Sequence, residues 1–248
     1  NFYTDHGTYY FNMGYSYQDI EEVNPGNAFV AFEGYSMPAN SNFQSEKVYN
    51  SEFEVKHRIT ANLTWTGEVF GDNLSVVSLS FTGREGRHFS HTMRSNGTYG
   101  GFAGFATWDG YNSQLLYVPD GSSDSKVTYA DDFDKDAFFA YINGQECLQP
   151  GKISRRHGCT SRWISRLDFH MMQEITVSGD HKLEISFDIE NLGNLINDDW
   201  GRAESYVQPF NAPVVDVAIN DDGQYVYSNF TQPTPTVAKI PSVWKAQL

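Results

Sequence analysis

The stretch that decides the fold is Tyr9-Tyr10-Phe11-Asn12-Met13-Gly14-Tyr15-Ser16-Tyr17-Gln18. Its odd-numbered positions carry aromatic or aliphatic side chains, and most of the even-numbered ones carry polar or small side chains. Successive side chains of a β-strand point to opposite faces, so this stretch predicts a strand with one apolar and one polar face.

Five further segments alternate in the same way, namely residues 56–65, 77–84, 163–177, 182–190 and 238–248. Charged residues fall almost entirely on their polar sides. In a membrane-spanning strand this segregation has an energetic cause, because an Arg or Lys facing lipid at mid-membrane costs about 2–4 kcal/mol. The six segments therefore predict an all-β protein.

The connections between these segments alternate between long and short. The links over residues 20–51, 86–160 and 191–236 are long, whereas Gly67 to Asn73 and Ser178-Gly179-Asp180 form short turns. Unequal loops of this kind are typical of a transmembrane antiparallel β-barrel with periplasmic turns and extracellular loops. The alternative is a soluble β-sandwich, in which one face of each sheet is buried.

The composition agrees with a barrel. The chain contains 18 Phe, 15 Tyr and 5 Trp, enough for aromatic girdles, and its net charge of −14 disfavours nucleic acid as a partner. Six spanning strands are too few to close a barrel, since the smallest have about eight. We therefore expect residues 1–248 to be part of a larger barrel, with strands before Asn1 and a few residues after Leu248. A hairpin over residues 215–227 is expected to form an extracellular ribbon.

Several segments, in order, resemble the C-terminal part of Oar-like TonB-dependent outer-membrane receptors. The most specific is Asp188-Ile189-Glu190-Asn191-Leu192-Gly193-Asn194-Leu195-Ile196-Asn197-Asp198-Asp199-Trp200-Gly201-Arg202. The others are residues 21–25, 49–58, 81–87, 167–168, 173–175 and 181–182. The chain departs from the family in ending at Leu248 rather than at an aromatic residue.

This resemblance implies a location in the bacterial outer membrane and a barrel of about 22 strands. It also implies an N-terminal plug and a TonB-contacting box, neither of which is present in this chain. The partners would be outer-membrane lipid, TonB through those absent parts, and a surface protein or peptide. The function implied is ligand capture by the extracellular loops followed by energised uptake. The alternatives are a non-transporting surface barrel for adhesion or assembly, and a soluble all-β carbohydrate-binding protein.

Two groups of residues are candidates for this function. The first group would face the lumen and contact the plug or line the transport path: Arg58, Arg84, Arg166, Asp168, Glu184 and Asp188. The second lies in or near a Gly-rich run and would contact a ligand: Tyr99, Phe102, Phe105 and Trp108. The alternative for the second group is a loop that folds over the barrel mouth and buries its own aromatic rings.

The long link over residues 86–160 carries the remaining chemistry. Cys147 and Cys159 are the only cysteines, and outside the cell such a pair usually forms a disulfide, although two free thiols remain the alternative. A metal site is less favoured, because only His157 lies close in the sequence. Six aspartates also crowd this link: Asp120, Asp124, Asp131, Asp132, Asp134 and Asp136.

These carboxylates could bind Ca²⁺, but their spacing does not match an EF-hand. The favoured interpretation is solvated and capping carboxylates, with Asp134 capping a short helix that ends at Asn143-Gly144. No cofactor is therefore expected. Enzymatic activity is not expected either, since a Ser165, Asp168 and His170 triad would have to come from a single strand.

Overall fold

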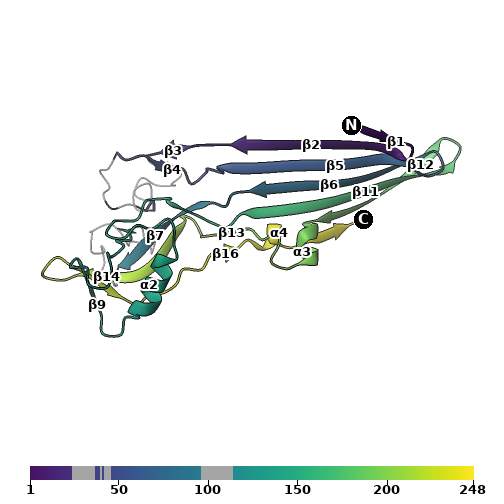
Figure 1. Ribbon diagram of the computed structural model, residues 1–248. Helices are drawn as coiled ribbons and strands as arrows, with labels where there is room; N and C mark the ends of the chain where they lie inside the picture. The colour runs from purple at the N-terminus through teal and green to yellow at the C-terminus, as the bar shows by residue number, and fades with distance from the viewer. Residues whose placement is uncertain (24–36, 40, 42–45, 96–113) are drawn as a thin grey trace.

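The computed structural model describes residues 1–23, 37–39, 41, 46–95 and 114–248. The chain is mostly β, as predicted, and its largest unit is a seven-stranded antiparallel sheet (Figure 1). In spatial order its strands are β1 (Phe2–Thr4), β2 (Gly7–Tyr17), β5 (His57–Phe70), β6 (Asn73–Arg84), β11 (Ile164–Ser178), β12 (His181–Glu190) and β17 (Lys245–Gln247). The sheet is open, with β1 and β17 at its edges.

Five of the six predicted strands are confirmed, but the sixth is mostly wrong. Within residues 238–248 only β17 is a strand, and α4 (Lys239–Ser242) precedes it. Proline lacks the N–H that a ladder requires, so Pro241 interrupts strand pairing there. The Ser242 hydroxyl instead accepts a hydrogen bond from the Ala203 N–H at 2.9 Å.

The register of the sheet separates the side chains into two faces. One cross-strand row contains only apolar side chains: Phe11, Leu63, Leu79, Phe169, Ile189 and Ala246. The next row, on the opposite face, contains Asn12, Asn62, Ser80 and Asp168. We call these the apolar face and the polar face. Their separation follows directly from the alternation in the sequence.

Tight turns join the strands at one end of the sheet, which we call the turn end. Gly71 and Gly179 both have positive φ there, at 62° and 57°, as two-residue hairpin turns require. The long connections all leave from the opposite end, which we call the loop end (Figure 1). The predicted alternation of short and long connections is thus confirmed, and β1 adds a further hairpin with β2.

A second sheet with its own core lies at the loop end (Figure 1). Its strands are β7 (His88–Ser95), β8 (Gln114–Leu115), β9 (Val127–Tyr129), β10 (Cys159–Thr160), β14 (Asn211–Ile219) and β15 (Tyr225–Ser228). Helix α2 (Lys135–Asn143) accompanies them, and we call this unit the loop module. Its core consists of module residues such as Met93, Phe138, Val214 and Tyr227, each 0% exposed, and no residue of the apolar face belongs to it.

The expected extracellular ribbon is partly wrong. The hairpin exists, since β14 pairs with β15 around residues 220–224. It does not project as a ribbon, because β14 also pairs in parallel with β7. Val214, Val215 and Val217 are buried, so the hairpin forms the centre of the module core.

Short elements complete the connections. Two-stranded ladders form between β3 (Glu21–Glu22) and β4 (Tyr49–Asn50) and between β13 (Glu204–Ser205) and β16 (Thr236–Val237). Helix α3 (Leu192–Ile196) follows β12 and packs against β11. In the part of the chain that the structure describes, no helix has both the length and the apolar character needed to cross a membrane.

Candidate functional site

Charged side chains gather on the polar face where β11, β12 and β17 lie side by side. Arg166 Nε lies 2.7 Å from Asp168 Oδ1, and Arg166 Nη2 lies 3.2 Å from Glu190 Oε2. His170 Nδ1 lies 2.7 Å from Asp188 Oδ1. These groups line a pocket of about 450 Å³, to which Ser80, Lys245 and Gln247 also contribute. The predicted lumen-facing residues did not include Ser80, His170, Glu190, Lys245 or Gln247, because neither the strand alternation nor the spacing shows which side chains share a pocket.

Two of the predicted lumen-facing residues lie apart from this pocket, nearer the loop end. Arg58 of β5 and Arg84 of β6 are direct cross-strand partners. Like charges placed directly opposite each other destabilise a sheet. Neither arginine is in an ion pair with any residue that the structure describes.

The predicted lumen-facing set therefore separates into three places. Arg166, Asp168 and Asp188 meet in the pocket, and Arg58 and Arg84 form the cross-strand pair. Glu184 stands apart from both, opposite Glu174 toward the turn end. Glu174 is engaged by Lys182, whose Nζ lies 2.7 Å from its carboxylate.

Asp168 also anchors the segment that follows β12. Its Oδ1 accepts the Asn191 N–H at 2.7 Å, and the buried Asn191 amide donates to the carbonyls of Gly201 and Pro241. A Cβ on Gly201, which has φ +65°, would lie 1.8 Å from Asn191 Oδ1, so only glycine fits there. Residues 191–201 thus fold against β11 instead of extending as an external loop.

The residues of the triad considered above do not converge. Asp168 binds Arg166 and Asn191, while His170 pairs with Asp188. Ser165 lies opposite Gly83, and its side chain points to the apolar face, away from Asp168 and His170. The three side chains therefore lack the mutual contacts that nucleophilic catalysis requires.

A buried polar joint connects the loop module to the residues just before β5. His88 Nε2 lies 2.6 Å from Glu54 Oε2, and their side chains are 4% and 0% exposed. The Ile20 N–H donates to the other Glu54 oxygen at 2.9 Å. His157 Nδ1 lies 2.7 Å from the Asn50 carbonyl oxygen, and the Arg156 guanidinium stacks on the Tyr49 ring. No local pattern in the sequence indicated this joint, because its partners are 34 to 107 residues apart.

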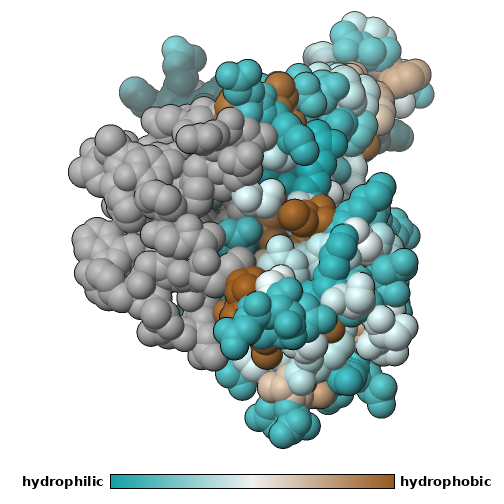
Figure 2. Space-filling model, turned by 90° about the vertical axis from the view of Figure 1, so that its left-hand side faces the viewer, coloured by the Kyte–Doolittle hydropathy of each residue, from teal (hydrophilic) through white to brown (hydrophobic). Residues whose placement is uncertain are grey.

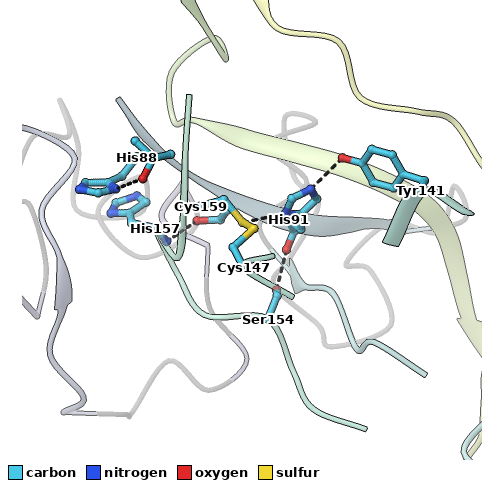
Figure 3. Close-up of a disulfide and its surroundings, with 9 residues drawn as sticks. His88, His91, Tyr141, Cys147, Ser154, His157 and Cys159 are labelled. Atoms are coloured by element: carbon cyan, nitrogen blue, oxygen red, sulfur yellow. Dashed lines mark hydrogen bonds between the residues drawn. A yellow bond between two sulfur atoms is a disulfide. The ribbon is translucent and has the colours of Figure 1, made fainter. Parts of the chain in front are cut away.

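The predicted disulfide between Cys147 and Cys159 is confirmed (Figure 3). The nearest imidazole is that of His91 rather than His157, with His91 Nδ1 3.2 Å from Cys159 Sγ. His91 Nε2 lies 2.7 Å from the Tyr141 hydroxyl. His91, Cys147 and Cys159 could hold a metal ion by their positions, but here the two sulfurs bond to each other, so they are not available as thiolate ligands.

Burial sets the protonation of two histidines in the module. Desolvation lowers the pKa of His91 to about 4. Desolvation also lowers the pKa of His157 to about 4, although its hydrogen bond to Asn50 acts in the opposite direction. Both imidazoles are therefore neutral at pH 7. The positive charge of Arg156 also disfavours a second positive charge on His157.

Two acidic residues of the module, Asp134 and Asp124, have structural roles. Asp134 caps α2 by accepting the Ala137 N–H at 2.9 Å, and the helix ends at Asn143 with Gly144 as its C-cap, as predicted. Asp124 accepts the N–H groups of Asp120 and Lys126 and the Tyr117 hydroxyl. These backbone donors lower the pKa of Asp124. Calcium binding, the less favoured alternative, stays untested, and both Asp124 oxygens are already engaged.

The ligand-loop candidates Tyr99, Phe102, Phe105 and Trp108 lie outside the described residues. The part of the loop end that the structure describes is mostly hydrophilic, as Figure 2 shows when the molecule is viewed from that end. The fold and the site together define a mostly β protein whose long antiparallel sheet carries one charged face and one apolar face. No protein-family model, curated protein or solved structure matches the chain.

Proposed function

We propose that the seven-stranded sheet is part of a transmembrane β-barrel in a bacterial outer membrane, within a TonB-dependent receptor of the Oar-like kind. The observation that carries this proposal is the exposure of the apolar face. Phe11 is 55% exposed and Met13 is 65% exposed in the middle of β2. An apolar surface that extends over several strands is expected to contact lipid or another protein.

Aromatic rings bound this face at both ends. At the turn end, Phe2, Tyr9 and Trp65 are successive cross-strand partners. At the loop end, the His57 ring lies 5.3 Å from that of Tyr17 and 6.4 Å from that of Trp163, between ring centroids. Rows of aromatic residues at both interfaces are typical of outer-membrane barrels.

The separation of the two rows fits a membrane. Eight residues separate Tyr9 from Tyr17 on β2 and His57 from Trp65 on β5. At about 3.3 Å per residue this is about 26 Å along the strand, and about 20 Å along the membrane normal after tilting by about 40°. The apolar band of an outer-membrane barrel is about 25 Å tall. No charged residue occupies the apolar face between the rows on β2, β5 or β6.

In this arrangement the polar face lines the barrel interior and the loop module stands outside the cell. The module would capture the ligand, and the charged residues of the polar face would contact a plug or the passing ligand. The resemblance to Oar-like receptors supports energised uptake as the function.

Depth-dependent quenching of tryptophan fluorescence tests the membrane proposal. Variants that retain only Trp65 or only Trp163 should both be quenched by lipids brominated near the headgroup, and less by lipids brominated deep in the chain. A variant that retains only Trp200 is the control and should not be quenched. Trp200 packs beside Gly193 in the segment that Asp168 holds on the polar face, away from lipid in this proposal. If none of the three is quenched and the protein stays in the aqueous fraction without detergent, the proposal is wrong.

Transport has its own test. Labelled peptides supplied to cells that express the intact protein would reveal what enters. Deletion of TonB should abolish that uptake, and uptake that continued unchanged would exclude energised transport.

A second candidate function is adhesion or assembly by a barrel that does not transport. The specific observation in its favour is the loop module, which has its own core and a disulfide and so presents a preformed surface. Binding of cells or surface proteins that survived TonB deletion, without any uptake, would favour this candidate.

A further inference from the structure

We propose that Arg58, Arg84 and Arg87 form a binding site for the carboxylate or phosphate group of an anionic ligand. The site lies at the loop end of the polar face, where β6 continues toward the loop module. As a description of what the receptor takes up, this inference rests on the proposed function. Anion binding itself can be measured whatever covers the apolar face.

The three arginines are brought together by the backbone. Arg58 and Arg84 are paired in the register of β5 and β6, so their side chains leave the same face in adjacent positions. Arg87 follows three residues after Arg84, in the short segment between the end of β6 and the start of β7. A cross-strand pair of like charges costs stability unless a counter-charge is supplied.

No such counter-charge comes from the neighbouring strands. The acids on the polar face of β11 and β12 are engaged elsewhere, since Asp168 and Glu190 bind Arg166 and Asp188 binds His170. In the ranges that the structure describes, none of the three arginines has an acidic partner within ion-pair distance. Yet the chain carries 31 acidic residues against 17 basic ones. An incoming anion would therefore supply the counter-charge that this cluster lacks.

The chemistry of arginine identifies the ligand class. A guanidinium offers a planar fork of donors that matches a carboxylate or a phosphate in a bidentate arrangement. The Arg87 guanidinium lies 5.2 Å from the centre of the Phe210 ring, a cation–π contact that restricts its orientation. Arg58 and Arg87 are exposed and Arg84 is half-buried, so a ligand can reach all three.

Calorimetric titration of the intact protein in detergent tests the site, with citrate and pyrophosphate as probes and uncharged glycerol for comparison. We expect saturable binding of at least one anion and none of glycerol. Arg84→Gln should weaken that binding by roughly 10- to 100-fold, as loss of a charged hydrogen-bonding partner does. Binding of citrate alone assigns the site to carboxylates, and binding of pyrophosphate alone assigns it to phosphates.

Arg202→Gln is the matched control, because Arg202 is already paired with Asp199 and Glu204 and lies outside the cluster. It should leave the affinity for the probes unchanged. Without probes, Arg84→Gln should not lower the free energy of unfolding, since it removes a repulsion. The site is refuted if neither anion binds, or if the two variants weaken binding equally.

The outcomes also separate this inference from the membrane proposal. Tryptophans quenched by lipid together with no anion binding would refute the site alone. Saturable binding together with unquenched tryptophans would refute the membrane location alone.

Discussion

Glu54 lies at the centre of the buried joint between the loop module and the residues just before β5. Its carboxylate is fully buried and satisfies both His88 and the Ile20 N–H. Removal of a buried hydrogen-bonding partner leaves the groups that it contacted unsatisfied. We therefore expect Glu54→Ala to lower the free energy of unfolding by about 1–3 kcal/mol, measured by urea denaturation.

Two comparisons make that measurement specific. Glu54→Gln keeps an oxygen that can accept the Ile20 N–H, so its loss should be smaller. Glu146→Ala removes an exposed carboxylate of the same module and should change stability by no more than about 0.5 kcal/mol. Equal effects of Glu54→Ala and Glu146→Ala would show that the joint does not stabilise the fold.

The buried histidines predict how stability depends on pH. The pKa of His91 and that of His157 are lowered to about 4, against about 6.5 in the unfolded chain. Between these values the unfolded state binds more protons, so stability falls as pH decreases from about 6.5 to about 4. Each histidine accounts for about 3 kcal/mol over this range, and below about pH 4 its contribution to the slope disappears.

Urea denaturation of the loop module at pH 7 and at pH 4.5 measures this effect. His91→Gln should reduce the pH-dependent loss by about half, because His157 remains to titrate. An unchanged pH dependence in that variant would show that His91 is not the neutral buried group described above.

Among the elements, the segment that follows α2 is joined to β10 by the disulfide between Cys147 and Cys159. The bond joins residues 12 apart, and closing a loop of that size stabilises the folded state by about 3 kcal/mol on the chain-entropy model. Replacing both Cys147 and Cys159 by Ser should lower the stability of the module by that amount. Hydrogen exchange should then accelerate in α2 and β7 but not in β5 or β6, and equal acceleration in all four would contradict an independent module core.

Elements specified by local signals were predictable from the sequence, and those specified by distant contacts were not. The alternation in β2 and β12 and the capping residues of α2 each act within a few residues, so pattern alone predicted them. The fold of residues 191–201 depends on Asp168, more than twenty residues earlier, and the burial of β14 depends on β7. The alternation predicted that the charged candidates share the polar face. It could not predict which of them meet in the pocket and which form the arginine pair, because that depends on how the strands are aligned.

At the scale of the whole molecule, the medium that covers the apolar face decides the function, and neighbouring residues of β6 can test it. Leu79 lies at the centre of the apolar face and is 36% exposed, whereas Ser80 points to the polar face. In a membrane, Leu79→Arg should weaken folding into liposomes by about 2–4 kcal/mol, because the charge would face lipid near mid-membrane. Ser80→Arg adds the same charge one residue away but toward the interior, so it should be tolerated within about 1 kcal/mol.

If the apolar face contacted water, both variants would fold nearly as well as the parent, because a partly exposed position accepts an arginine readily. Urea titration of liposome-folded protein distinguishes these results, and equal midpoints for the two variants would exclude lipid as the medium covering this face.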